Sequence, residues 1–245
     1  MDIIDIVKNC IAEGNVIRLP KIELSRAEYI AVKKAFENYG GKWKGGKIYG
    51  FVFSANNAVE VANAIINGSS VNKKKDFQFY ATPDWVADMM AEDLNIQPWE
   101  RVLEPSAGTG SLVNAVHRVC REIEVDCYEL DDINRKTLQS LPCTNIIGDD
   151  FTQRVGIEEY DVIIANPPFS KNQDITHLMK MYDSLKAGGR IACLTSTHWT
   201  FANDSESRQF REWVADKCTH LQELPRGTFK ESGTDIATVY LMIKK

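Results

Sequence analysis

Long apolar runs, paired cysteines and clustered metal ligands are all missing from this sequence of 245 residues. No stretch approaches the roughly 20 consecutive apolar residues that a membrane-spanning helix requires. The first residues, MDIIDIVKNC, carry acids where a secretory signal needs basic residues, and their apolar run is too short for one. The sequence therefore predicts neither a membrane span nor an export signal.

The cysteines and histidines are dispersed along the chain. None of the six cysteines forms a C-x-x-C pair, and the four histidines stand alone. A structural or catalytic metal needs such ligands at close spacing, so no metal is expected. Reduced and mostly buried thiols are typical of a reducing compartment, and this absence of paired cysteines predicts a cytoplasmic protein.

Charge is unevenly distributed, although the net charge of −5 describes a mildly acidic chain. Residues 1–78 hold 12 Lys and Arg against 8 Asp and Glu, whereas residues 79–245 hold 17 against 26. A basic segment joined to an acidic body indicates two units with different partners. The length suits one large α/β domain with a small addition, so we expect domains at 1–78 and 79–245.

The first 78 residues predict a small α+β domain. Ser25 and Glu28 form a capping-box pattern before apolar residues at helical spacing. Residues 42–44 and 47–53 flank a Gly-Gly turn and are typical of a hairpin. The other expected elements are a strand at 16–20, a helix at 56–67 and a boundary loop at 68–78.

From residue 79 onward, the pattern predicts strands that alternate with helices. Strands are expected at residues 101–104, 124–129, 144–147, 160–165, 190–194, 220–224 and 237–243. Helices are expected from Pro83, and at residues 110–119, 132–141, 174–185 and 205–217. Such alternation indicates an α/β fold with a doubly wound, mostly parallel sheet of seven strands, whose ligands bind at the carboxyl ends of the strands.

A glycine-rich segment, Leu-Glu-Pro-Ser-Ala-Gly-Thr-Gly, occupies residues 103–110 between a strand and a helix. Glycines there let the backbone turn tightly and approach a bound molecule without a Cβ atom in the way. The dinucleotide fingerprint is incomplete, because Gly108-Thr-Gly110 continues into Ser-Leu-Val. Alone, this pattern favours a plain turn, but its coupling to Glu104 and to the motifs that follow favours a cofactor loop.

Acidic residues follow the next two strands. Glu129 lies about 20 residues after the glycines, where an acid contacts the ribose hydroxyls of a nucleoside cofactor. Gly-Asp-Asp-Phe at residues 148–151 places a carboxylate beside an aromatic ring. The carboxylate can accept a hydrogen bond from an adenine amine while the ring packs on the base. Taken singly, these residues are equally compatible with a surface acid and an ordinary loop.

Asn166-Pro167-Pro168-Phe169 directly follows the strand at 160–165. Two prolines end the strand and stiffen the backbone, which fixes the Asn166 amide and the Pro167 carbonyl. Two such acceptors suit a planar –NH2 group, and bonding both of its N–H groups favours a more nucleophilic nitrogen. Phe169 offers a flat face for a base taken out of its stack. A proline-rich turn without function is a much weaker interpretation.

Together these motifs resemble those of class I S-adenosylmethionine-dependent methyltransferases of the adenine-N6 DNA type, over about residues 78–245. The resemblance implies a Rossmann-like sheet, S-adenosyl-L-methionine as cofactor and DNA as partner. It assigns catalysis to Asn166, Pro167, Pro168 and Phe169. It assigns cofactor binding to Tyr80, Thr82, Pro83, Glu104, Ala107, Gly108, Gly110, Glu129, Asp150 (preferred over Asp149) and Phe151.

Two further segments bear on the substrate. Gly-Thr-Phe at residues 227–229 resembles the hairpin that supplies a second aromatic against the flipped base in that family, with Phe229 as the candidate. Relatives with this motif order usually add a C-terminal target-recognition domain, which we expect to be missing here. Lys42, Trp43 and Lys44 interleave cations with an aromatic, as substrate phosphate contacts and stacking require. A solvated structural cap is an equal alternative for this segment.

The leading hypothesis is methyl transfer to the N6 amine of an adenine flipped out of DNA. RNA adenine-N6 transfer, protein glutamine-amide transfer and a non-catalytic S-adenosylmethionine-binding protein are the alternatives. The glutamine enzymes usually carry N-P-P-Y, so Phe169 favours a nucleobase. The basic front segment is similar to those of phage and mobile-element proteins, so we expect a bacterial or phage-encoded enzyme.

Overall fold

The computed structural model describes residues 2–53, 55, 57–68, 80–155, 157–232 and 234–245. The chain divides into two compact units, which we call unit 1 (Met1–Phe79) and unit 2 (Tyr80–Lys245). Asn56, Phe79 and most of the expected boundary loop lie outside the described residues. In the part of the chain that is described, no helix is long and apolar enough to cross a membrane.

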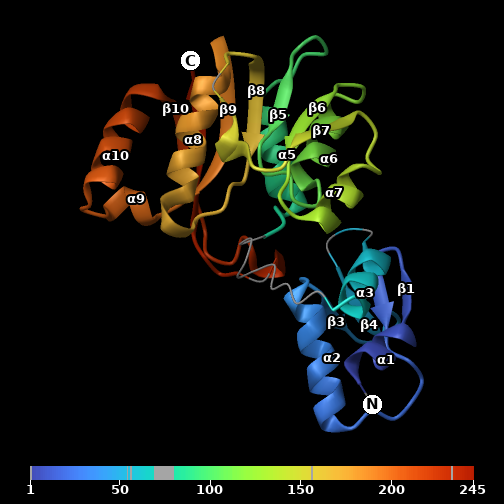
Figure 1. The fold of residues 1–245 in the computed structure, drawn as a ribbon. Coiled ribbons are helices and arrows are strands. Elements are labelled where there is room, and N and C mark those ends of the chain that lie inside the picture. The colour runs from blue at the N-terminus through green and yellow to red at the C-terminus, as the bar shows by residue number, and fades with distance from the viewer. Residues whose placement is uncertain (1, 54, 56, 69–79, 156, 233) are drawn as a thin grey trace. The chain divides into compact units, whose positions relative to one another are not determined.

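Unit 1 contains a small antiparallel sheet with strand order β1-β2-β4-β3 and helices packed beside it (Figure 1). Its core centres on Phe36 and Phe51, both fully buried, with ring centroids 5.0 Å apart. The capping box is present, because the Ser25 side chain accepts from Glu28 N and the Glu28 carboxylate accepts from Ser25 N. The elements are α1 (Ile3–Lys8), β1 (Ile11–Glu13), β2 (Val16–Arg18), α2 (Arg26–Asn38), β3 (Lys42–Lys44), β4 (Gly50–Val52) and α3 (Ala58–Ile66).

Unit 2 is built on a seven-stranded sheet with strand order β10-β11-β9-β8-β5-β6-β7. The pairs β5-β6, β5-β8, β6-β7 and β8-β9 are parallel, whereas β11 is antiparallel to both of its neighbours. The strands are β5 (Val102–Glu104), β6 (Val125–Tyr128), β7 (Thr144–Gly148), β8 (Tyr160–Ala165), β9 (Leu185–Ser196), β10 (Cys218–Leu224) and β11 (Thr238–Lys244). The α-helices are α5 (Asp84–Asp93), α6 (Ser111–Val119), α7 (Asp132–Leu138), α8 (Gln173–Ser184), α9 (His198–Phe201) and α10 (Ser205–Lys217). The expected doubly wound sheet is therefore confirmed.

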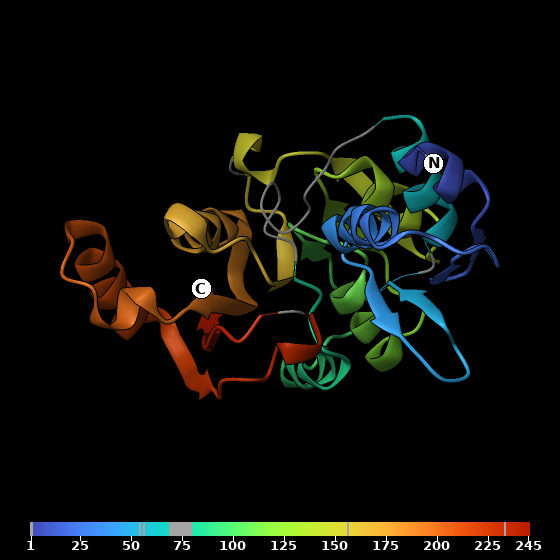
Figure 2. The same cartoon turned by 90° about the horizontal axis from the view of Figure 1, so that it is seen from below.

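Helices cover both faces of this sheet and form a three-layer arrangement. Along β8, Val162 and Ile164 enter one core with α5, α6 and α7, whereas Ile163 and Ala165 enter the other with α8, α9 and α10. Figure 2 shows α5 and α8 on opposite sides of the sheet. Because both faces are buried, β8 is apolar at almost every position, as is typical of a central parallel strand.

One strand extends further than the sequence pattern predicts. The strand expected at residues 190–194 begins earlier, at Leu185, so Gly188 and Gly189 lie inside β9. Gly188 N donates to Lys245 O at 2.9 Å, and Lys245 N donates to Gly189 O at 3.0 Å. These contacts join residues far apart in the sequence, so the glycines remain paired in the sheet.

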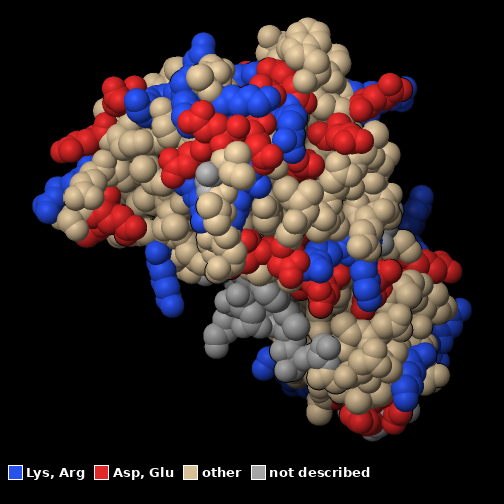
Figure 3. Space-filling model, turned by 45° about the horizontal axis from the view of Figure 1, so that its top comes forward, with Lys and Arg blue, Asp and Glu red and all other residues tan. Residues whose placement is uncertain are grey.

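The amino ends of the parallel strands carry charges that pair with one another. Arg101 contacts Asp126 at 3.0 Å and Glu159 at 3.3 Å, and Lys186 contacts Asp161 at 2.8 Å. Acidic and basic side chains are intermingled over this face, which comes forward in Figure 3. The described charges therefore neutralise one another locally at this end of the sheet.

Candidate cofactor and catalytic site

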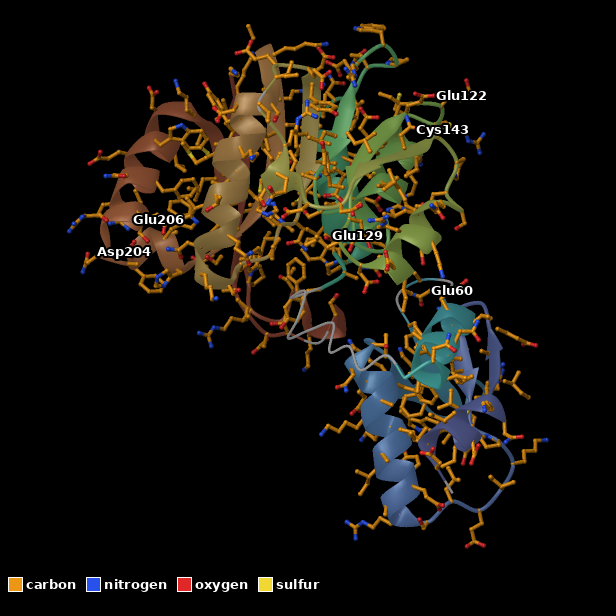
Figure 4. All side chains as sticks on the ribbon, viewed as in Figure 1. Glu60, Glu122, Glu129, Cys143, Asp204 and Glu206 are labelled. Carbon is orange, nitrogen blue, oxygen red and sulfur yellow. The ribbon has the colours of Figure 1, made fainter. Side chains whose placement is uncertain are left out.

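The expected functional residues of unit 2 gather at the carboxyl ends of the strands. Glu104 ends β5, Glu129 follows β6, Asp150 follows β7 and Asn166 follows β8. These four strands are neighbours in the order β8-β5-β6-β7, so their ends lie side by side. Figure 4 shows Glu129 at this end of the sheet and Cys143, which precedes β7, at the opposite end. The fold thus brings the expected cofactor and catalytic motifs together at the carboxyl end of the sheet, which we call this edge of unit 2.

The orientation of the Asn166 amide is set by residues 84 and 86 positions earlier in the sequence. Asn166 Nδ2 donates to Tyr80 O at 3.2 Å and to Thr82 Oγ1 at 3.1 Å. A backbone carbonyl can only accept, so the nitrogen of the amide must face Tyr80. The other amide atom, Oδ1, accepts no hydrogen bond from any described residue. Asn166 therefore presents a free acceptor beside Pro167.

The glycine loop has backbone conformations that side chains rarely adopt. Gly108 has φ +55° and Gly110 has φ +86°. A Cβ atom on Gly110 would lie 2.5 Å from Leu141 Cδ1 and 3.2 Å from Leu138 Cδ2. The start of α6 packs closely against Leu138 of α7 and Leu141, and a Cβ atom on residue 110 would force these side chains to shift.

Glu129 holds the glycine loop in place. One carboxylate oxygen accepts from Gly108 N at 2.6 Å. The other accepts from Asp131 N at 2.8 Å and from Asn134 Nδ2 at 3.3 Å. Burial raises the pKa of Glu129, and these hydrogen bonds from Asp131, Gly108 and Asn134 act against that rise. The carboxylate is thus a buried acceptor pointing at the loop.

Glu104 lies beside it and is only 1% exposed. Its Oε1 accepts from Ser106 N at 3.0 Å and from the Ser106 hydroxyl at 3.3 Å, whereas its second oxygen accepts from no described residue. Burial raises the pKa of Glu104 well above its ordinary value; the Ser106 hydrogen bond opposes this, and the nearby Glu129 charge adds to it. A buried carboxyl group with a raised pKa is stabilised either by binding a proton or by a nearby cation.

We expect the Glu104→Gln variant to gain stability over the wild type as pH rises. A folded-state pKa above the unfolded value stabilises the fold at low pH, and this stability is lost as pH rises from about 4.5 through the folded pKa. Gln cannot ionise, so it lacks this loss. Thermal unfolding of both proteins from about pH 5 to 8 measures the difference.

Comparing the two proteins at each pH removes the contribution of other groups. Burial lowers the pKa of His177 to about 4, so His177 favours the fold as pH rises, but it does so equally in both proteins. A constant difference in melting temperature across this range would contradict a buried, titrating Glu104.

Asp150 caps the short turn that begins at Phe151. Its carboxylate accepts from Thr152 N at 2.8 Å and from the Thr152 hydroxyl at 2.6 Å. Burial acts to raise the pKa of Asp150, but the Thr152 and Gln153 hydrogen bonds outweigh it and hold this pKa below its ordinary value. Asp149 instead forms an ion pair with Arg135. Asp150 is therefore the acid that is fixed beside the aromatic residue.

Phe151 does not present the open ring that the sequence suggested. Its side chain is 1% exposed and lies between Tyr128 and His177, with ring centroids 5.4 and 5.8 Å away. The ring belongs to the core under the loop, because α8 covers it. The Lys180 ammonium group of α8 donates to Thr152 O. The contacts of His177 and Lys180 cannot be predicted from the sequence, because a turn of helix does not show which loop it will contact.

The two phenylalanines expected to flank a base differ in exposure. Phe169 is half-buried and packs against the core that contains α5. Phe229 is 2% exposed within the same core, so in this structure it is a packing residue with no open face. Ser232, three residues later, donates to Ala81 O and joins this segment to the one that carries Tyr80 and Thr82.

The other residues expected in the site lie partly in unit 2 and partly in unit 1. Pro83 immediately precedes α5, and Ala107 N donates to Tyr128 O at 3.0 Å, which ties the glycine loop to the end of β6. Lys42, Trp43 and Lys44 form β3 of unit 1. Within the described ranges, no three His, Cys, Asp or Glu side chains gather as a metal site.

Comparison with known proteins finds similarity to methyltransferases. The profile of the "Methyltransferase small domain" family matches residues 73–207. Type II methyltransferase M.CvrRI of Paramecium bursaria Chlorella virus XZ-6E is 27% identical over 100 residues, which cover 41% of this chain and 26% of that protein. Type II methyltransferase M.AccI of Acinetobacter calcoaceticus is 29% identical over 110 residues, covering 43% and 20%.

Solved structures support the same fold. The methyltransferase subunit of a type I restriction-modification system from Streptococcus thermophilus superposes with a TM-score of 0.60 at 19% identity, covering 77% of this chain and 49% of that one. The match spans about a quarter or less of the length of the two curated relatives. The family profile covers more than half of the chain, which therefore belongs to the Methyltransferase small domain family and has the class I methyltransferase fold in unit 2.

Proposed function

We propose that unit 2 transfers a methyl group from S-adenosyl-L-methionine to the exocyclic N6 amine of adenine in DNA. One observation carries this proposal. Tyr80 O and Thr82 Oγ1 take both directions of the Asn166 NH2 group, which leaves Asn166 Oδ1 as an acceptor next to Pro167. An amide oxygen and a carbonyl oxygen at adjacent residues match the two N–H groups of an aromatic amine.

The residues at the carboxyl end of the sheet fit the cofactor. S-adenosyl-L-methionine, when bound, supplies an electrophilic methyl group on a positively charged sulfonium. The buried carboxyl group of Glu104 has an oxygen without a partner among the described residues, and its raised pKa makes a nearby cation favourable. Gly108 has positive φ and no Cβ atom, so a ligand can approach the backbone closely at this residue.

The resemblance and the geometry together suggest which residues would hold each part. Glu129 would bind the ribose and Asp150, beside Phe151, the adenine. The methionine part would be held by Glu104, Ala107, Gly108 and Gly110 with Tyr80, Thr82 and Pro83. Glu129 can exchange its contact with Gly108 N for a hydroxyl donor without leaving its other two donors.

Asn166 and Pro167 would position the amine, and positioning supplies much of the rate in such a displacement. The two prolines restrict the backbone, so the acceptors need little reorganisation when the amine arrives. Phe169 would contact the extruded base with its exposed part. No covalent bond to the chain is needed, and the proton of the product would leave to water.

The names of the relatives favour DNA over the alternatives. The two curated relatives described above are both called type II methyltransferases. The aromatic residue of the motif is Phe169, whereas the protein glutamine enzymes that it resembles usually carry Tyr. RNA and glutamine amides are therefore alternatives that the assay below separates from DNA.

Incubation of the full chain with methyl-labelled S-adenosyl-L-methionine and DNA, RNA or protein substrates tests the proposal. We expect label in DNA alone, and N6-methyladenine in its nucleoside digest by mass spectrometry. The Asn166→Ala variant serves as the control for contaminating activity. Label confined to RNA or protein, or equal label with the control variant, would overturn the proposed function.

A further inference from the structure

The β3–β4 hairpin of unit 1 carries a concentration of positive charge. We call residues 42–49 the basic hairpin. It contains three lysines, and no acid occurs between Glu37 and Glu60 in the sequence. Lys44 and Lys47 are exposed and form no ion pair with any described residue. The charges at the amino ends of the strands in unit 2, in contrast, neutralise one another.

The same hairpin carries an exposed aromatic ring. Tyr49 is 67% exposed and has φ +44°, a conformation that is unusual for a bulky residue. Its ring meets the edge of Trp43, with centroids 5.1 Å apart, and Trp43 in turn meets Phe51 of the core at 5.1 Å. Trp43 is thus a support, and Tyr49 is the residue that offers an open face.

The turn of the basic hairpin leaves room for a polymer. Nothing lies within 4 Å of a Cβ atom built on Gly45 or on Gly46. Arg18 Nε donates to Ile48 O at 3.2 Å and holds the base of the turn. In Figure 2 the light-blue hairpin projects from the rest of unit 1. A flexible chain can therefore reach the ring and both lysines.

We infer that the basic hairpin binds single-stranded DNA, with a base stacked on Tyr49 and phosphates at Lys44 and Lys47. An exposed ring can stack only on an accessible base face, which a duplex hides inside its own stack. The two exposed lysines of the same hairpin suit a backbone that carries one charge per nucleotide. The identity of the nucleic acid as DNA rests on the proposed function, but the binding surface does not use the edge of unit 2.

The test measures the affinity of the full chain for a fluorescent oligothymidine of about 12 nucleotides, a length that one such platform covers. This probe contains no adenine, so it cannot enter the proposed catalytic site. Tyr49→Gly removes the ring and relieves the positive φ, so we expect unchanged or higher thermal stability and about tenfold weaker binding. Tyr49→Phe should bind like the wild type.

Charge variants separate phosphate contacts from general attraction. The double variant Lys44→Gln/Lys47→Gln should lower the steepness of log affinity against log salt by about 0.7 per lysine. Lys34→Gln, the same substitution at one exposed lysine of α2, is the control for each hairpin lysine and should leave that slope as it is. If Tyr49→Gly binds like the wild type, or if a duplex of equal length competes as well as a single strand, the inference is overturned.

A second substitution protects the test against misfolding. Asn adopts positive φ more readily than most residues. Tyr49→Asn therefore removes the ring without added backbone strain, and it must weaken binding as Tyr49→Gly does. Methylation is scored separately. If the Tyr49 variants lose oligothymidine binding but still transfer methyl groups, both the binding role of the basic hairpin and the proposed function are supported. If binding depends on Tyr49 but the wild type transfers no methyl group, only the proposed function is overturned.

Discussion

Replacing Asn166 by Ala is expected to lower kcat for methyl transfer by at least about a hundredfold, while the affinity for S-adenosyl-L-methionine stays within about twofold. The substitution removes the acceptor Oδ1 together with the NH2 group that donates to Tyr80 O and Thr82 Oγ1. The cofactor contacts expected at Glu104 and Glu129 remain. Single-turnover rates and equilibrium binding of the cofactor measure the two quantities independently.

The two hydrogen bonds that orient the Asn166 amide can be tested by the same kinetic measurement. Thr82→Val keeps the shape of the side chain but removes one of the two acceptors for Asn166 Nδ2, so we expect kcat to fall about tenfold with the KM for DNA unchanged. Thr144→Val makes the same atomic change at the other end of the sheet and should have no effect on kcat. If both variants lost activity alike, or if Asn166→Ala remained active, the assigned role of the amide would be wrong.

Replacing Gly110 by Ala is expected to destabilise unit 2 by about 2–5 kcal/mol. Part of this cost is the positive φ, which disfavours any L side chain by about 1–2 kcal/mol. The other part is overpacking, about 1–3 kcal/mol, because the new methyl group would lie 2.5 Å from Leu141 Cδ1. Urea unfolding followed by circular dichroism measures the sum.

A matched glycine separates these two contributions. Gly188 has almost the same φ, +83°, but a Cβ atom there meets nothing within 4 Å. Gly188→Ala should therefore cost only the conformational part, about 1–2 kcal/mol. Adding Leu141→Ala to Gly110→Ala should recover part of the steric cost, and equal losses at the two glycines would show that packing against α7 is unimportant.

Much of the fold follows from patterns within single segments. The strand Tyr160–Ala165 and the helix Ser205–Lys217 have the bounds that apolar periodicity predicts. The short helices Ile3–Lys8 and His198–Phe201 were missed, because so few residues display no period. The length of β9 was also missed, since it depends on pairing with Lys245, which is remote in the sequence.

The candidate site shows the same limit more sharply. Motif spacing predicts that Glu129 and the glycine loop share an edge of the sheet, and the structure joins them through Gly108 N. It does not predict which way the Asn166 amide turns, because Tyr80 and Thr82 decide that from outside the motif. Nor does it predict exposure: an aromatic residue in a loop can be buried, as Phe229 is, or open.

The paired charges at the amino ends of the strands have a consequence for engineering. Tyr160 to Ala165 spans the length of β8, roughly 20 Å at the usual rise per residue, so Arg101 and Asp161 lie far from Asn166. Free-energy changes at sites this far apart generally add. Substitutions that tighten the ion pairs should therefore raise heat resistance without altering turnover, which gives this sheet one end to reinforce and another to leave untouched.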